Sequence, residues 1–116
     1  MPRDFSRTER VGQLLQTAVA KVVQDYLRDK SELFVTVTST EVSRDFSIAK
    51  VFISVLPDDD IAVKKVLKLL TEQSKQFRYE LAHTVTLRRM PALRFYFDSS
   101  IKTGSQINHL LQNIEG

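Results

Sequence analysis

The chain has 116 residues, of which 42% are hydrophobic, so it is long enough for one domain with a hydrophobic core. It contains no cysteine, which excludes disulfides, thiolate metal sites and thiol catalysis. The net charge is only +3 and no apolar run approaches the roughly 18 residues of a membrane span, so we expect a cytoplasmic protein without membrane contact.

The first predicted element is a long amphipathic helix from about Arg7 to Arg28. Ser6 and Glu9 have the spacing of a capping box, which satisfies backbone amides at a helix start. The predicted buried face of this helix comprises Val11, Leu14, Leu15, Ala18, Val22 and Tyr26, widened by Val19, Val23 and Leu27. Because so broad an apolar face needs a wide partner surface, we expect the helix to pack on a sheet.

Two strands are predicted next. Residues 33–38 and 49–55 alternate in character and are rich in β-branched side chains, which is typical of half-buried strands. The polar tripeptide Ser43-Arg44-Asp45 lies between them and indicates the turn of an antiparallel hairpin. We favour a local structural role for Asp45, which can pair or cap within this turn.

A second helix is predicted after Pro57. The acidic residues 58–60 can cap free amides and suit the positive end of the helix dipole. Hydrophobic periodicity alone predicts one continuous helix to about His83, and the β-branched residues 84–86 should end it.

Met90-Pro91 breaks the chain again, and residues 93–97 alternate as a third strand. The connection from the second strand through a helix to the third is a crossover, so both helices should cover one face of a three-stranded sheet. We therefore predict an α+β fold, with residues 1–100 as one domain. Residues 101–116 form a tail that is either a short helix around Ile107–Ile114 or disordered.

Positive charge is concentrated in one part of the chain. Between residues 71 and 94, five cations stand against two acids, an excess equal to that of the whole chain. Such a local patch indicates a phosphate-facing surface better than a global isoelectric point does. The alternative is a solvated face with scattered cations. The five are Lys75, Arg78, Arg88, Arg89 and Arg94.

Three further arginines, Arg3, Arg7 and Arg10, lie on or near the first helical turn, where a cation is unfavourable for the helix dipole. Contact with RNA would explain them, and a flexible, solvated N-terminus would explain them equally well. Arg44 in the hairpin turn is a weaker candidate for the same contact. Tyr96 faces away from the core side of the third strand and is a candidate for base stacking, although we favour a purely structural role.

Three groups of motifs lie in order along the chain: residues 7–11 (RTERV), residues 43–46 (SRDF) with 49–52 (AKVF), and residues 88–93 (RRMPAL) with 95–100 (FYFDSS). Together they resemble the ribosome-binding factor A family over about residues 5–100. Each motif is weak by itself, and the set in this order is specific.

This resemblance implies a KH-like fold of the bacterial type II, α-β-β-α-kink-α-β, with the helices on one face of the sheet. It also implies a non-enzymatic assembly factor that binds the small (30S) ribosomal subunit and its 16S rRNA. Such a factor assists late rRNA processing and maturation, especially in the cold, and other assembly factors are further partners. The RNA-binding residues expected here are Lys75, Arg78, Arg88, Arg89, Arg94, Arg7, Arg10 and Arg44.

One stretch departs from the family pattern. The family has a kinked helix pair, often with Ala and Gly near the kink, in place of the Gly-rich loop by which KH domains grip single-stranded RNA. The matching residues 72–75 read EQSK and contain neither. We place the helix break near Ser74, with Lys75 and Arg78 just after it.

The sequence contains no motif that predicts catalysis. It lacks a Walker loop, a nucleophile elbow and a histidine paired with an acid, and His83 and His109 have no neighbours at metal-ligand spacing. We expect no catalytic residue, metal or cofactor, and a monomer, because no apolar face is left over after the core is assigned. The rival hypothesis is a small protein-interaction or ligand-sensing α+β module.

Overall fold

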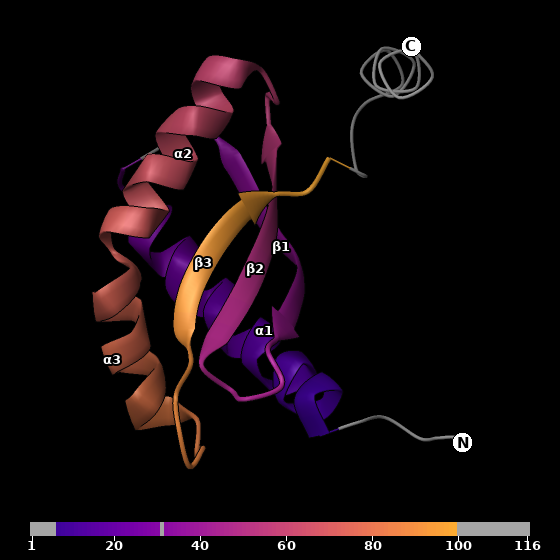
Figure 1. Ribbon diagram of the computed structural model, residues 1–116. Helices are drawn as coiled ribbons and strands as arrows, with labels where there is room; N and C mark the ends of the chain where they lie inside the picture. Colours follow the sequence, from indigo (N-terminus) through magenta and orange to yellow (C-terminus); the bar gives the residue numbers. More distant parts are fainter. Residues whose placement is uncertain (1–6, 31, 100–116) are drawn as a thin grey trace, which may run out of the picture.

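The computed structural model describes residues 7–30 and 32–99, which form an α+β fold (Figure 1). The observed order confirms the predicted α-β-β-α-kink-α-β arrangement. Arg3, Ser6 of the expected capping box and the tail of residues 101–116 lie outside the described residues. The elements are α1 (Arg7–Leu27), β1 (Phe34–Val42), β2 (Ile48–Leu56), α2 (Asp60–Glu72), α3 (Ser74–Thr84) and β3 (Ala92–Phe97).

The three strands form one mixed sheet in the order β1-β2-β3. β1 and β2 pair antiparallel, which confirms the hairpin, and β2 and β3 pair in parallel, as the crossover through α2 and α3 requires. β1 runs to Val42, beyond the predicted residue 38, because its polar second half still pairs with β2. A bulge between Val37 and Ser39 shifts the register and brings Glu41 opposite Lys50.

All three helices cover one face of the sheet, and no other element of residues 7–30 and 32–99 covers the opposite face, which is turned toward the viewer (Figure 1). The odd-numbered residues 49–55 of β2 are buried against the helices, whereas the even-numbered residues of β2 and β3 are half-buried or exposed. We call the face that carries residues 48–56 (even) and 92–96 (even) the open sheet face. This alternation follows from the two-residue period of a strand.

Aromatic rings join the helices to the covered face. Phe77 of α3 is only 1% exposed and makes edge-to-face contacts with Tyr26 of α1 and Phe95 of β3, at centroid distances of 5.4 and 6.0 Å. The core therefore joins residues that are far apart in the sequence, and α3 is held against α1 and β3 through the single ring of Phe77.

The buried face of α1 is rotated relative to the prediction. Leu15, Val19 and Val23 are fully buried, as expected, whereas Leu14 is 52% exposed, so its predicted burial is wrong. The face is centred on the row that begins at Gly12, where α1 approaches the backbone of β1. A Cβ at Gly12 would lie 2.7 Å from the carbonyl oxygen of Thr40, so a side chain there would force helix and strand apart.

The long second helix is broken in two. α2 begins with Asp59, whose side chain accepts a hydrogen bond of 2.8 Å from the amide of Ala62, as the acidic run predicted. Gln73 leaves the helical conformation at φ −95° and ψ 1°, so the continuous helix expected from periodicity is wrong and the break expected near Ser74 is confirmed. The buried residues Leu70 and Phe77 are seven positions apart, about two turns, so the hydrophobic period continues through the break and conceals it.

Candidate nucleic-acid interface

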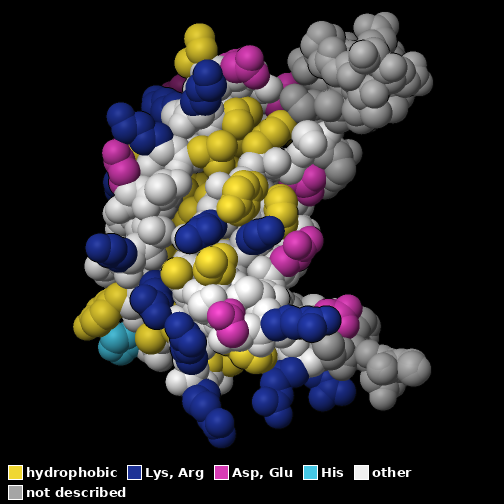
Figure 2. All heavy atoms as spheres, viewed as in Figure 1, with side chains coloured by type: hydrophobic (Ala, Val, Ile, Leu, Met, Phe, Trp, Pro, Cys, Tyr) yellow, Lys and Arg dark blue, Asp and Glu magenta, His cyan; other side chains and the backbone are white. Residues whose placement is uncertain are grey.

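Three segments meet at one end of the molecule: the start of α1, the β1–β2 turn and the α3–β3 loop (Figure 1). They surround a depression of about 410 Å³. Basic side chains gather at this end in the space-filling view (Figure 2). We call Arg7, Arg44, Arg88 and Arg89 the basic end. Three of these four line the depression, and Arg44 precedes Asp45, which also lines it.

A network of short hydrogen bonds shapes the β1–β2 turn. Asp45 Oδ1 accepts hydrogen bonds from the Ser43 hydroxyl (2.8 Å), the Ser47 hydroxyl (2.7 Å) and the Ser47 amide (3.0 Å). The bonds from Ser47, followed by the one from Ser43 and the charge of Arg89, lower the pKa of Asp45 from 3.8 to about 2. The local capping role predicted for Asp45 is confirmed, and the negative charge that it keeps lies near Arg89.

The same turn contains a residue in the left-handed region. Phe46 has φ 61°, and its amide donates to the carbonyl oxygen of Ser43 at 2.9 Å. A bulky residue in this conformation is rare, so the surrounding hydrogen bonds must hold it there. Phe46 lines the depression together with Val11 and Leu87, which gives the basic end an apolar floor between its guanidinium groups.

The α3–β3 loop is tied to α3 by Arg78. Its Nε donates a hydrogen bond of 3.0 Å to the carbonyl oxygen of Met90, one residue beyond Arg89. This bond uses one of the five N–H groups of a guanidinium. Arg78 is therefore a positioning residue for the loop that carries Arg88 and Arg89, as well as an exposed cation in its own right.

The other expected RNA-binding residues lie outside the basic end, although the sequence grouped three of the cations of residues 71–94 with Arg88 and Arg89. Arg10 is exposed on α1, one turn after Arg7, and Lys75 is exposed at the start of α3. Arg94 projects from the open sheet face, where it lies in register with Lys50 of β2. Lys50 was not among the RNA-binding residues predicted from the sequence. The signal was present, because Lys50 and Arg94 both occupy outward positions of their strands.

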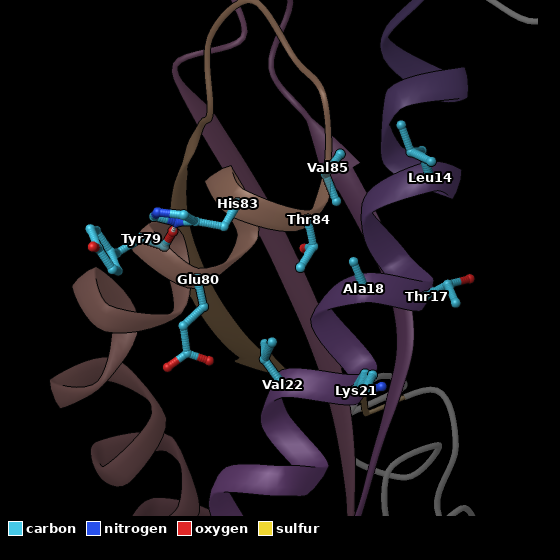
Figure 3. Close-up of a pocket in the computed structure, with 10 residues that line it drawn as sticks. All are labelled: Leu14, Thr17, Ala18, Lys21, Val22, Tyr79, Glu80, His83, Thr84 and Val85. Carbon is cyan, nitrogen blue, oxygen red and sulfur yellow. Dashed lines mark hydrogen bonds between the residues drawn. The ribbon is translucent and has the colours of Figure 1, made fainter.

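A second cavity, of about 880 Å³, lies between α1 and α3 (Figure 3). Leu14, Ala18 and Val22 of α1 line one side of it, and Tyr79 and His83 of α3 line the other. The His83 ring packs against Tyr79 at a centroid distance of 4.6 Å, and its Nδ1 is 2.8 Å from the Tyr79 carbonyl oxygen. This groove explains the exposure of Leu14, because α3 covers that side of α1 only in part.

Within residues 7–30 and 32–99, no group of three or more His, Asp or Glu side chains is arranged to hold a metal ion. No helix in the same part of the chain is long and apolar enough to cross a membrane.

Sequence comparison identifies close relatives of this chain. The model of the ribosome-binding factor A family matches residues 7–111. Ribosome-binding factor A of Ectopseudomonas mendocina is 38% identical over 114 residues, which cover 97% of this chain and 88% of that protein. The protein of the same name from Shewanella sp. strain W3-18-1 is 39% identical over 114 residues, which cover 98% of this chain and 76% of the relative.

Comparison with solved structures gives the same result for the fold. The crystal structure of ribosome-binding factor A from Thermus thermophilus aligns with a TM-score of 0.67 at 22% identity, over 78% of this chain and 96% of that one. A homology model of the Thermus thermophilus factor, as fitted into the cryo-EM map of a 30S–RbfA complex, aligns with a TM-score of 0.65 at 25% identity, over 79% of this chain and 96% of that one. On the agreement of the family model, the relatives and the fold, this chain belongs to the ribosome-binding factor A family.

Proposed function

We propose that this protein is an assembly factor that binds the small (30S) ribosomal subunit and its 16S rRNA, assists late rRNA processing and maturation, and matters most at low temperature. Family membership supports this proposal, and so does the Thermus thermophilus relative that was fitted into a 30S complex. The observation that carries it is the basic end, where three arginines from distant segments surround one depression.

The basic end would act by electrostatic docking on folded rRNA. Exposed guanidinium groups bind phosphate oxygens in a bidentate manner, which gives affinity and register rather than sequence choice. The factor would favour one rRNA conformation through its higher affinity for it and would leave when the mature subunit no longer offers that conformation. The protein works in this proposal as a cytoplasmic monomer without cofactor or catalysis, with residues 1–100 as its binding domain.

The test is charge reversal at the α3–β3 loop. Arg88→Glu with Arg89→Glu should weaken binding to the small subunit by about 2 kcal/mol or more, roughly thirtyfold, because two phosphate contacts become repulsive. Binding is measured by co-sedimentation with separated small and large subunits, at near-physiological and at high salt. The wild type should bind the small subunit alone, saturably, and lose that binding at high salt.

The matched control reverses two other neighbouring cations. Lys64→Glu with Lys65→Glu makes the same charge change on exposed positions of α2 and should leave subunit binding within about twofold. Circular dichroism should be unchanged in both double variants. Retained binding by the Arg88/Arg89 variant would overturn the assignment of the basic end, and binding of the wild type to neither subunit would favour a protein-interaction module.

A further inference from the structure

The open sheet face carries two successive rows of side chains with different chemistry. In the first row, Phe52 of β2 lies in register with Tyr96 of β3, and their rings are 5.6 Å apart and inclined at 31°. Tyr96 is 38% exposed, so part of its ring is available to a ligand. The Phe52 ring supports the Tyr96 ring from the side and limits its orientation.

The second row is cationic. Lys50 and Arg94 lie directly in register on the parallel strands, and both are exposed. Like charges placed opposite one another on neighbouring strands destabilise a sheet. Glu41 of β1 pairs with Lys50 from the strand on the far side of β2 from β3, and its carboxylate offsets one of the two positive charges. An anion bound over the β2–β3 side of this row would offset the other.

The distance between the rows suits a nucleotide. Side chains two residues apart on a strand are about 6.6 Å apart, which is within the reach of a base and its own phosphate. Figure 2 shows hydrophobic and basic side chains next to one another on this face. Aromatic rings beside cations form the usual surface on which single-stranded nucleic acids bind, because every base has a face that can stack.

We propose that the open sheet face binds unpaired RNA nucleotides, with a base stacked on Tyr96 and its phosphate held by Lys50 and Arg94. This inference rests on the proposed function, since it takes rRNA to be the partner. It adds a contact surface distinct from the basic end, which belongs to the turn and loops. The RNA strand would follow β2 and β3, because Glu41 repels phosphate on the β1 side.

The arrangement of the apolar side chains favours RNA over a protein as the occupant. Phe34 and Leu56 are 78% and 52% exposed, but the polar pair Thr36 and Ser54 separates them from the aromatic row. The buried centre of a protein interface is typically apolar and depleted of charged residues. Here the centre of the face holds the aromatic row and the two cations.

The first experiment measures binding to a fluorescein-labelled oligouridine strand of about 12 nucleotides by fluorescence anisotropy, with a duplex of equal length as the comparison. Tyr96→Ala should raise the Kd for the single strand about tenfold, because the stacking ring is removed. Tyr96→Phe keeps the ring and should change the Kd by less than about twofold. Tyr79→Ala is the matched control, since Tyr79 is 63% exposed on α3.

Equal Kd values for Tyr96→Ala, Tyr96→Phe and the wild type would overturn the inference, as would equal binding of single strand and duplex. Co-sedimentation of the same variants with small subunits separates this inference from the proposed function. If the wild type binds small subunits but Tyr96→Ala leaves oligouridine binding unchanged, the inference about the open sheet face is wrong and the proposed function stands. If Tyr96→Ala weakens oligouridine binding but the wild type does not bind small subunits, the proposed function is wrong and the open sheet face still binds RNA. If Tyr96→Ala weakens subunit binding but not oligouridine binding, the face contacts a protein, and the RNA assignment is wrong.

Discussion

The basic end and the open sheet face present cations in two different ways. Arg7, Arg88 and Arg89 belong to segments that are far apart in the sequence, and the fold brings them around one depression with an apolar floor. Lys50 and Arg94 come from two strands and are aligned by sheet register alone. The positions of the cations at the basic end depend on the conformations of the turn and the loop. The positions of Lys50 and Arg94 depend only on the pairing of β2 with β3.

This difference has a consequence for binding. The basic end offers mainly charge, so its contribution should be lost as salt rises. The open sheet face adds the Phe52 and Tyr96 rings, whose stacking does not depend on releasing counterions. One protein would thus combine a salt-sensitive contact that sets position with a stacking contact that selects unpaired bases.

The largest expected effect destabilises the fold that positions both regions. Gly12→Ala places a methyl group 2.7 Å from the Thr40 carbonyl oxygen, between the helix that carries Arg7 and the strand that pairs with β2. Overpacking costs about 1–3 kcal/mol, and the gain of about 1 kcal/mol in helix propensity offsets part of this cost. Because the close contact is with backbone, which cannot move aside easily, we expect the free energy of unfolding to fall by up to about 2 kcal/mol in urea denaturation.

The control for this prediction is Gln13→Ala at the exposed neighbouring position, which should change stability by less than about 0.5 kcal/mol. Equal stability of the two variants would mean that helix and strand can separate at no cost, and that α1 does not couple the two regions.

The next effect should separate the two regions. Arg88→Gln with Arg89→Gln should reduce the slope of log affinity against log salt by about 1.5, since each lost phosphate contact contributes about 0.7 to 0.9. Tyr96→Ala should weaken binding and leave the slope unchanged. Both are measured by titrating small subunits with labelled protein at several salt concentrations. An identical loss of slope in both variants would mean that both regions bind RNA mainly through their charges.

The smallest effect concerns the turn that supports the basic end. The hydrogen bonds to Asp45 lower its pKa from 3.8 to about 2, so its charged form stabilises the folded state above pH 3.8. That contribution is lost as the pH falls from 3.8 to about 2. Asp45→Asn should therefore lower Tm slightly at neutral pH, and the difference from the wild type should shrink across this interval.

Arg44→Gln serves as the control for the turn, because it changes a neighbouring charge and keeps the hydrogen bonds of Ser43 and Ser47 to Asp45. Thermal unfolding followed by circular dichroism at several pH values provides the measurement. A Tm difference for Asp45→Asn that stays constant down to pH 2 would show that the carboxylate charge does not stabilise the turn.

The local structure of this protein could be read from the sequence to a large extent. The two-residue alternation of β2 places Val51 and Ile53 in the core, and the acidic run before α2 provides the Asp59 cap. The cap and turn chemistry depends on residues only two or three positions apart. For such short-range features, tertiary context adds little, and the predictions for the hairpin turn at Asp45 and the start of α2 were confirmed.

The sequence by itself determined which residues alternate, which cap and which carry charge. Hydrophobic periodicity predicted one continuous helix, since Leu70 and Phe77 keep the same hydrophobic phase on both sides of Gln73, and only the family resemblance placed a break near Ser74. The tertiary structure fixed that break at Gln73. It also decided that Leu14 borders a groove and that Arg94 lies beside Lys50, away from Arg88 and Arg89. The physical reason is that sequence periodicity defines faces within one element, whereas the grouping of faces depends on how distant elements pack.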